Sequence, residues 1–140
     1  MRLEGKNIVI VVANEFEDIE LLYPLLRLSE EGANIIVVPV RIGLHPRPSA
    51  EKPVSGRYGT PVPLEVMAPG KRYVVKGLEE IVPEELDCLL FPGGFSPDSL
   101  RVDRRVLELV RKVDRHGKLI AAICHGPQVL ISAGILKGRG

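Results

Sequence analysis

LIAAICHGPQVLISAG, residues 119–134, is the stretch that decides the fold. Its first five residues are apolar and have the length of a buried strand. Its last part runs from a proline to a glycine, and proline suits the first turn of a helix as glycine suits its end. A turn of cysteine, histidine and glycine joins the two parts. The stretch therefore predicts a buried strand that turns sharply into a helix.

The same alternation of strand and helix extends towards the N-terminus. The β-branched run 7–13 predicts a strand buried on both faces, as in a parallel sheet. An apolar repeat at helical spacing over 18–31 follows it, and 33–40 predicts the second strand. Residues 86–91 predict a third strand, and 104–116 predict a helix. This order predicts an α/β fold with a parallel sheet between helices.

A proline-rich excursion interrupts the alternation. Residues 39–69 hold seven of the twelve prolines, which excludes a long helix and predicts irregular surface structure. Short edge strands are expected at 62–66 and 73–75. We expect a single domain over residues 1–140, with the excursion at about 41–77.

The composition excludes several classes of protein. Nineteen basic and eighteen acidic residues leave a net charge of +1, which offers no electrostatic footprint for nucleic acid or an anionic membrane. The longest apolar runs fall far short of the roughly 20 residues that a bilayer requires. Two cysteines without further pairs favour free thiols in a reducing compartment. We therefore expect a cytoplasmic protein that binds neither nucleic acid nor membrane.

Three polar segments follow the predicted strands, at the end of a parallel sheet where ligands bind. They are residues 14–18, 92–94 and 124–126. A cysteine between a buried strand and a helix start has the layout of a nucleophile elbow. The N-terminus of the helix favours a thiolate there. Cys124 is therefore the predicted nucleophile, and the adjacent His125 could assist it or carry protons.

The other polar positions have two interpretations each. Gly93 and Gly94 could form a plain turn, but their place beside the elbow favours an oxyanion site made of backbone amides. Glu15 and Glu17 could stabilise a helix dipole, or one of them could hydrogen-bond the cysteine sulfur. Cys88 lies within an apolar run and is predicted to be a core residue. Without metal-ligand spacing or a phosphate-binding glycine loop, we expect no metal and no cofactor.

Three motifs closely resemble the ThiJ/PfpI superfamily, and within it the PfpI intracellular protease branch. They are ANEFEDIEL at 13–21, FPGG at 91–94 and AICHGPQVLISAG at 122–134, and they occur in the family's order. The resemblance covers about residues 6–40 and 84–140. It implies a flavodoxin-like, class I glutamine amidotransferase-like domain. Since relatives continue with another strand and a C-terminal helix, the chain is expected to lack those two elements.

The resemblance also implies roles for individual residues and an assembly. Cys124 would be the nucleophile, Glu17 its hydrogen-bonding carboxylic partner, and Gly94 with the amide after the elbow the oxyanion donors. The family assembles as dimers and often hexamers. In it the histidine at the position of His125 pairs with an acidic residue of the neighbouring subunit, and the matching position here is Asp98. The substrate classes implied are peptides and small reactive aldehydes such as methylglyoxal or its early protein adducts.

The leading hypothesis is a cysteine-dependent hydrolase, either an intracellular peptidase or a glyoxalase or deglycase that acts on reactive carbonyls. The alternative is a redox-responsive stress or chaperone protein in which Cys124 is an oxidation sensor. A flavin or nucleotide carrier is the third hypothesis, and the missing phosphate-binding loop counts against it.

Overall fold

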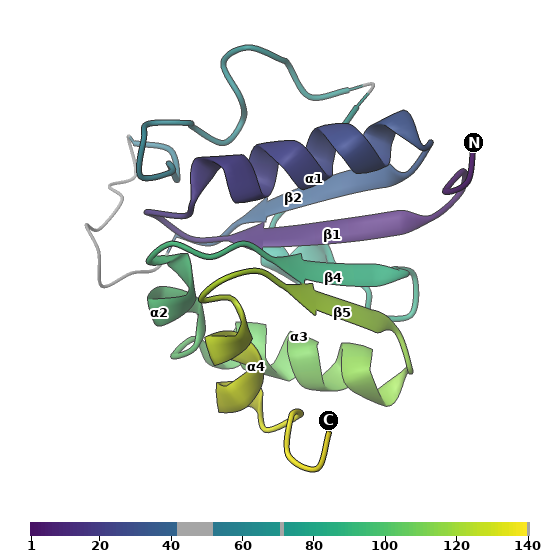
Figure 1. Cartoon of the computed structure of the whole chain (residues 1–140), viewed down its shortest axis with the longest axis vertical. Helices are drawn as coiled ribbons and strands as arrows, with labels where there is room; N and C mark the ends of the chain where they lie inside the picture. Colours follow the sequence, from purple (N-terminus) through teal and green to yellow (C-terminus); the bar gives the residue numbers. More distant parts are fainter. Residues whose placement is uncertain (42–51, 71, 140) are drawn as a thin grey trace.

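The computed structural model describes residues 1–41, 52–70 and 72–139. Within them, one parallel sheet has the strand order β3-β2-β1-β4-β5 (Figure 1). The strands are β1 (Asn7–Val12), β2 (Asn34–Pro39), β3 (Val74–Val75), β4 (Cys88–Phe91) and β5 (Leu119–Ala122). β2 and then β3 are added on one side of β1, and β4 and then β5 are added on its other side. The switch point of the sheet therefore lies between β1 and β4, where open parallel sheets bind ligands.

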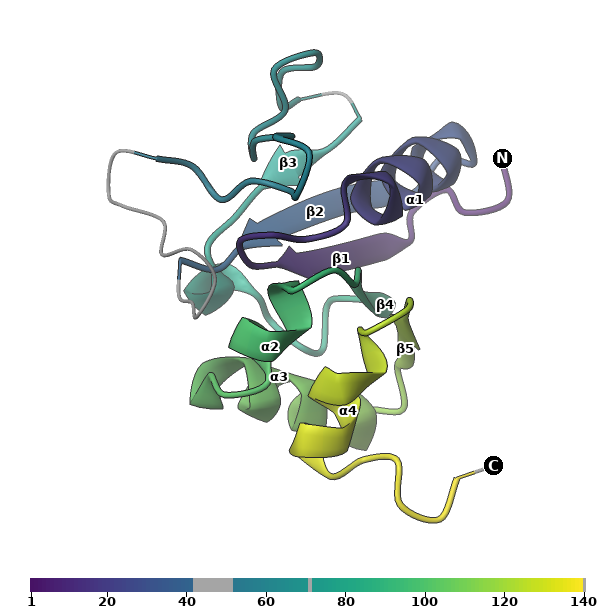
Figure 2. The ribbon, with the colours of Figure 1, turned by 60° about the vertical axis from the view of Figure 1, so that its left-hand side comes forward.

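Helices cover both faces of the sheet. They are α1 (Asp18–Glu30), the 3₁₀ turn η1 (Leu78–Glu80), α2 (Ser96–Leu100), α3 (Arg104–Arg115) and α4 (Pro127–Ala133). Figure 2 shows α1 on one side of the sheet and α2, α3 and α4 on the other. The predicted α/β fold is thereby confirmed. No helix in the described parts of the chain is long and apolar enough to cross a membrane.

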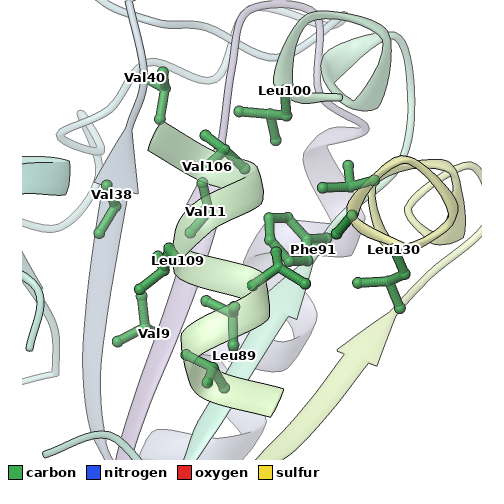
Figure 3. Close-up of a cluster of buried hydrophobic side chains, with 14 of the residues drawn as sticks. Val9, Val11, Val38, Val40, Leu89, Phe91, Leu100, Val106, Leu109 and Leu130 are labelled. Atoms are coloured by element: carbon green, nitrogen blue, oxygen red, sulfur yellow. The ribbon is translucent and has the colours of Figure 1, made fainter. Parts of the chain in front are cut away.

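Side chains of the central strand β1 alternate between two cores. Val9 and Val11 belong to the core under α3 and α4, where Figure 3 shows them beside Leu109 of α3. Ile8 and Ile10 belong to the core under α1. Successive residues of a strand point to opposite faces, so a strand that is covered on both faces needs apolar residues throughout. This explains why an unbroken β-branched run encodes β1.

The proline-rich excursion contributes to the core, which corrects the expectation that it lies on the surface. Val54, Val62 and Leu64 are buried in the core under α1, together with Tyr73. The Tyr73 hydroxyl accepts a hydrogen bond from the amide of Leu64 (3.0 Å) and donates one to the carbonyl of Met67 (2.6 Å). The expected strand at 73–75 is present as β3, whereas 62–66 forms no strand. The first part of the excursion lies outside the described residues.

The outer edge of β5 is exposed and lies beside an apolar groove. In the described residues β5 pairs only with β4, and Leu119 at its start is 66% exposed. A groove of about 790 Å³ lies beside this edge, and Cys88 and Leu119 are among the largely apolar side chains that line it. No strand or helix follows α4 among the described residues.

Candidate active site

The segments after β1, β4 and β5 meet at the switch point of the sheet. Phe16 and Gly94 form an isolated antiparallel bridge, across which the amide of Glu17 donates to the carbonyl of Gly93 (3.2 Å). A Cβ atom placed on Gly93 would lie only 3.0 Å from the Cβ of Cys124. The structure therefore brings together the three polar segments that the sequence singled out.

The turn after β5 has an unusual backbone. Cys124 has a φ of 56°, in the left-handed region that costs strain for any residue other than glycine. The turn is tight, because a Cβ on Gly126 would lie 2.5 Å from the carbonyl oxygen of Phe91. α4 begins immediately afterwards, and the Cys124 side chain is exposed. The backbone thus has the shape that the elbow prediction requires, while the role of Cys124 as nucleophile stays a prediction.

The double glycine supplies close backbone contacts. Gly94 has a φ of 74°, and a Cβ there would lie 2.5 Å from the carbonyl oxygen of Glu15. The amide of Gly93 donates to the Glu20 carboxylate at 2.8 Å. This amide is therefore already hydrogen-bonded. The Gly94 amide and the amide after the elbow remain as the predicted donors to an oxyanion.

Glu20 is a residue of the site that the sequence analysis missed. Its Oε1 would lie 2.8 Å from a Cβ on Gly93, and the Cβ of Cys124 would lie 3.0 Å from the same point. The Glu20 carboxylate is therefore a close neighbour of the cysteine. The available signal was helical spacing, because Glu20 lies three residues after Glu17 and so shares its face of the chain.

Glu17 has a different partner in the structure. Its Oε2 accepts a hydrogen bond from Arg57 at 3.1 Å, in an ion pair whose two side chains are partly exposed. The Arg57 guanidinium also lies over the rings of Tyr58 (5.6 Å) and Phe95 (5.5 Å). These contacts form one rim of the site, and the proposed bond from Glu17 to Cys124 stays a prediction.

The NEFED motif also anchors part of the excursion. The side-chain oxygen of Asn14 accepts from the amide of Ser55 (3.0 Å), and the Asp18 carboxylate accepts from the amides of Tyr58 and Thr60 (2.9 Å each). Burial raises the pKa of Asp18, but hydrogen bonds from the Thr60 side chain and from these two amides outweigh it and lower the pKa below its usual value. Asp18 therefore serves as a charged anchor of the loop beside the site.

The two remaining predicted residues lie at the same end of the sheet. His125 is exposed, and its Nδ1 lies 3.2 Å from the Nε2 of Gln128. Asp98 is half-buried in α2, where its amide donates to the carbonyl of Phe95 (3.1 Å). Their pairing across a subunit boundary stays a prediction.

Cys88 lies at the opposite end of the sheet, as the first residue of β4. Burial and the nearby Asp87 carboxylate raise the pKa of its thiol. Among residues 1–41, 52–70 and 72–139, no three His, Cys, Asp or Glu side chains are grouped so that they could hold a metal ion.

Comparisons with known proteins match nearly the whole chain. A family model described as the DJ-1/PfpI family matches residues 6–140. Deglycase PfpI of Pyrococcus furiosus is 39% identical over 133 residues, which are 95% of this chain and 69% of that protein. Protein/nucleic acid deglycase 2 of Escherichia coli is 36% identical over 135 residues, 96% of this chain and 69% of that protein. The structure of oxidized DJ-1 from Toxoplasma gondii has a TM-score of 0.73 and 25% identity, covering 95% of this chain and 64% of that one.

Proposed function

Because the chain belongs to the DJ-1/PfpI family, we propose that it is a cysteine-dependent deglycase, a hydrolase that acts on small reactive carbonyls or their early adducts on proteins. The observation that carries the proposal is the backbone at Cys124. A strained φ of 56° holds this exposed thiol above the carboxyl end of the sheet, directly before α4. Two relatives named as deglycases support the substrate class.

The chemistry needs a thiolate, an oxyanion site and a proton carrier. The Cys124 thiolate attacks the carbonyl carbon and forms a covalent hemithioacetal. The backbone amides of Gly94 and His125 donate to the oxyanion that develops. With the help of the His125 ring, a proton of the hemithioacetal carbon of methylglyoxal then moves to the neighbouring ketone carbon by way of an enediol, and water hydrolyses the resulting thioester to lactate and the free thiol. Glu20 holds the Gly93 loop to α1 by its hydrogen bond from the Gly93 amide, which helps these donors to keep their positions.

The proposal includes a homo-oligomer in the cytoplasm in which Asp98 of one subunit pairs with His125 of the next. The outer face of α1 next to the site supports such a contact, because Ile19 and Tyr23 are each 66% exposed there. Mixing Cys124→Ser chains with Asp98→Asn chains tests it. Mixed oligomers that contain one intact site should regain activity that neither variant has alone. Equal inactivity of the mixture and its components, with mixing confirmed by native mass spectrometry, contradicts the shared site.

The substrate class is tested with three assays, each applied to the same three purified proteins. Methylglyoxal consumption, release of the adduct from a methylglyoxal-treated peptide and cleavage of casein are followed for wild type, Cys124→Ser and Cys88→Ser. We expect activity in the two carbonyl assays, lost in Cys124→Ser and kept in Cys88→Ser. Casein cleavage without carbonyl turnover would replace the deglycase by a peptidase. If folded wild-type protein is inactive in all three assays, the proposal that the protein is an enzyme is wrong.

A redox sensor is the second candidate, and the exposure of Cys124 favours it. An exposed thiolate at a helix N-terminus is open to oxidation to a sulfenic or sulfinic acid. Peroxide should then add oxygen at Cys124, which mass spectrometry detects as a gain in mass. A sensor without enzymatic activity would show this gain and no carbonyl turnover. Turnover that is lost as Cys124 oxidises supports the enzyme instead.

A further inference from the structure

The side chain of Gln128 connects the first turn of α4 to the histidine of the site. His125 precedes the helix and Gln128 lies three residues later, so both lie on one face of the turn. The Nε2 atom of Gln128 lies 3.2 Å from the Nδ1 atom of His125. At the other end of the same amide, Oε1 is buried and has no hydrogen-bond partner, the one such side-chain atom among the described residues.

The buried end of the amide decides its orientation. An amide oxygen and nitrogen are similar in size, so Gln128 could face His125 with either atom. Turning the amide over would bury the NH₂ group, with its two donors, where the carbonyl oxygen now lies. Orphaned buried donors are rarer in proteins than acceptors with unused capacity. The orientation in the structure, with NH₂ towards His125, is therefore the less costly one.

We propose that Gln128 is a positioning residue that fixes the tautomer of neutral His125, with the proton on Nε2. The NH₂ group is a donor, so Nδ1 must be the acceptor and cannot carry the ring proton. The exposed Nε2–H is then the hydrogen-bond donor that neutral His125 presents to the carbonyl oxygen of the substrate, or to a neighbouring carboxylate. The inference deepens the proposed function, since the tautomer matters to turnover only if His125 acts on the substrate.

Two substitutions reverse or remove this constraint. Gln128→Glu keeps the length of the side chain but presents only acceptors, so the ring proton should move to Nδ1. A carboxylate in the first turn is favourable for the helix, but one of its oxygens would take the buried position of Oε1, so a thermal transition first checks that this variant folds. Gln128→Met keeps the shape and removes the hydrogen bond, and the ring should then populate both tautomers.

The test is a ¹⁵N NMR spectrum of histidine-labelled protein in which the neutral ring nitrogens report the tautomer. The His125 signals are assigned by their loss in His125→Asn, and His116, which contacts Glu84 instead, is the internal control. We expect the Nε2–H form in wild type, a mixture in Gln128→Met and the Nδ1–H form in Gln128→Glu, with His116 unchanged. An Nε2–H form that persists in Gln128→Glu overturns the proposal.

Kinetics separate this inference from the function on which it rests. If the proposed deglycase is correct, Gln128→Glu should lower kcat by about 10- to 100-fold and leave KM within about twofold, in line with the contribution of a positioned hydrogen-bond donor to a developing oxyanion. A lost thermal transition in both variants would assign Gln128 a structural role and reject the proposal. A tautomer that shifts as expected in a protein without carbonyl turnover would keep the positioning role and reject the deglycase.

Discussion

Two cysteines on neighbouring strands lie at opposite ends of the sheet and have opposite surroundings. Cys88 begins β4, is partly buried and has a thiol pKa that burial and Asp87 raise. Cys124 follows β5, is exposed and has a left-handed backbone directly before α4. The first environment raises the pKa of its thiol, whereas the second leaves its thiol exposed at the carboxyl end of the sheet.

The difference shows that place along the strand matters more than residue type. Parallel strands with crossover helices gather the N-termini of helices at the carboxyl end of the sheet, and the positive ends of the helix dipoles with them. The chain must also turn there, which creates close backbone contacts such as those of Gly93 and Gly126. At the amino end, where Cys88 lies, the helices arrive with their negative ends.

The largest effect that this comparison predicts is on catalysis. Cys124→Ser should lower kcat/KM for methylglyoxal by about 10³-fold or more, because the nucleophile is lost. Cys88→Ser should change it less than about threefold, since Cys88 lies at the far end of the sheet. Steady-state kinetics on purified variants measures both. Equal losses in the two variants would mean that the two ends do not differ as described.

The next effect concerns the glycines at the two ends of β5. Gly126→Ala should lower the free energy of unfolding by about 1–3 kcal/mol and turnover at least about 10-fold, because its Cβ would press on the carbonyl of Phe91. Gly117 lies before β5 with a φ of 67° and no atom within 4 Å of its Cβ position. Gly117→Ala should therefore cost about 1–2 kcal/mol of stability through its φ alone and leave turnover intact. Urea titration and kinetics of the pair separate the two outcomes.

Asp18 offers a smaller, pH-dependent effect at the carboxyl end. Its pKa is lower in the folded protein than in the unfolded chain, so its carboxylate contributes stability above the unfolded pKa of 3.8. That contribution is lost as the pH falls through the folded pKa. Asp18→Asn should therefore lower the free energy of unfolding by about 1–3 kcal/mol at pH 7, with the difference shrinking below about pH 4. Urea titrations over pH 3–7 check this, and a constant difference would contradict it.

The smallest effect concerns Asp87 at the amino end. Burial raises the pKa of Cys88, and the negative charge of the Asp87 carboxylate raises it further. Asp87→Asn should lower that pKa and speed alkylation of Cys88 about two- to threefold at pH 8. Mass spectrometry of the labelled peptides gives the rate for each cysteine. Alkylation of Cys124, far from Asp87, should not change.

The strands and the elbow could be predicted because their causes are local. The run 7–13 is apolar on both faces, and the turn at Cys124 is flanked by a strand, a glycine and a proline. The helix α2 was not predicted, because its five residues contain Pro97 and are too few to show an apolar repeat. The burial of Val54 could not be predicted either, because it depends on a tertiary contact with α1 that no local pattern encodes.

The site shows the same division between local and tertiary causes. The grouping of Cys124 with Gly93 followed from the rule that parallel strands bind ligands at their carboxyl ends. The part played by Glu20 and the ion pair between Arg57 and Glu17 could not be predicted, because each joins segments far apart in the sequence. Helical spacing marked Glu20 as a neighbour of Glu17, but only the fold shows which carboxylate reaches the double glycine.

The central claim is that the environment of Cys124, and not that of Cys88, makes a reactive nucleophile. The most direct measurement is alkylation of the wild-type chain with a substoichiometric amount of iodoacetamide at pH 7, followed by peptide mapping and an assay of residual methylglyoxal turnover. The account predicts label at Cys124 and loss of activity in proportion to it, with Cys88 unlabelled. Label that accumulates first at Cys88, or full activity after complete labelling of Cys124, would contradict it.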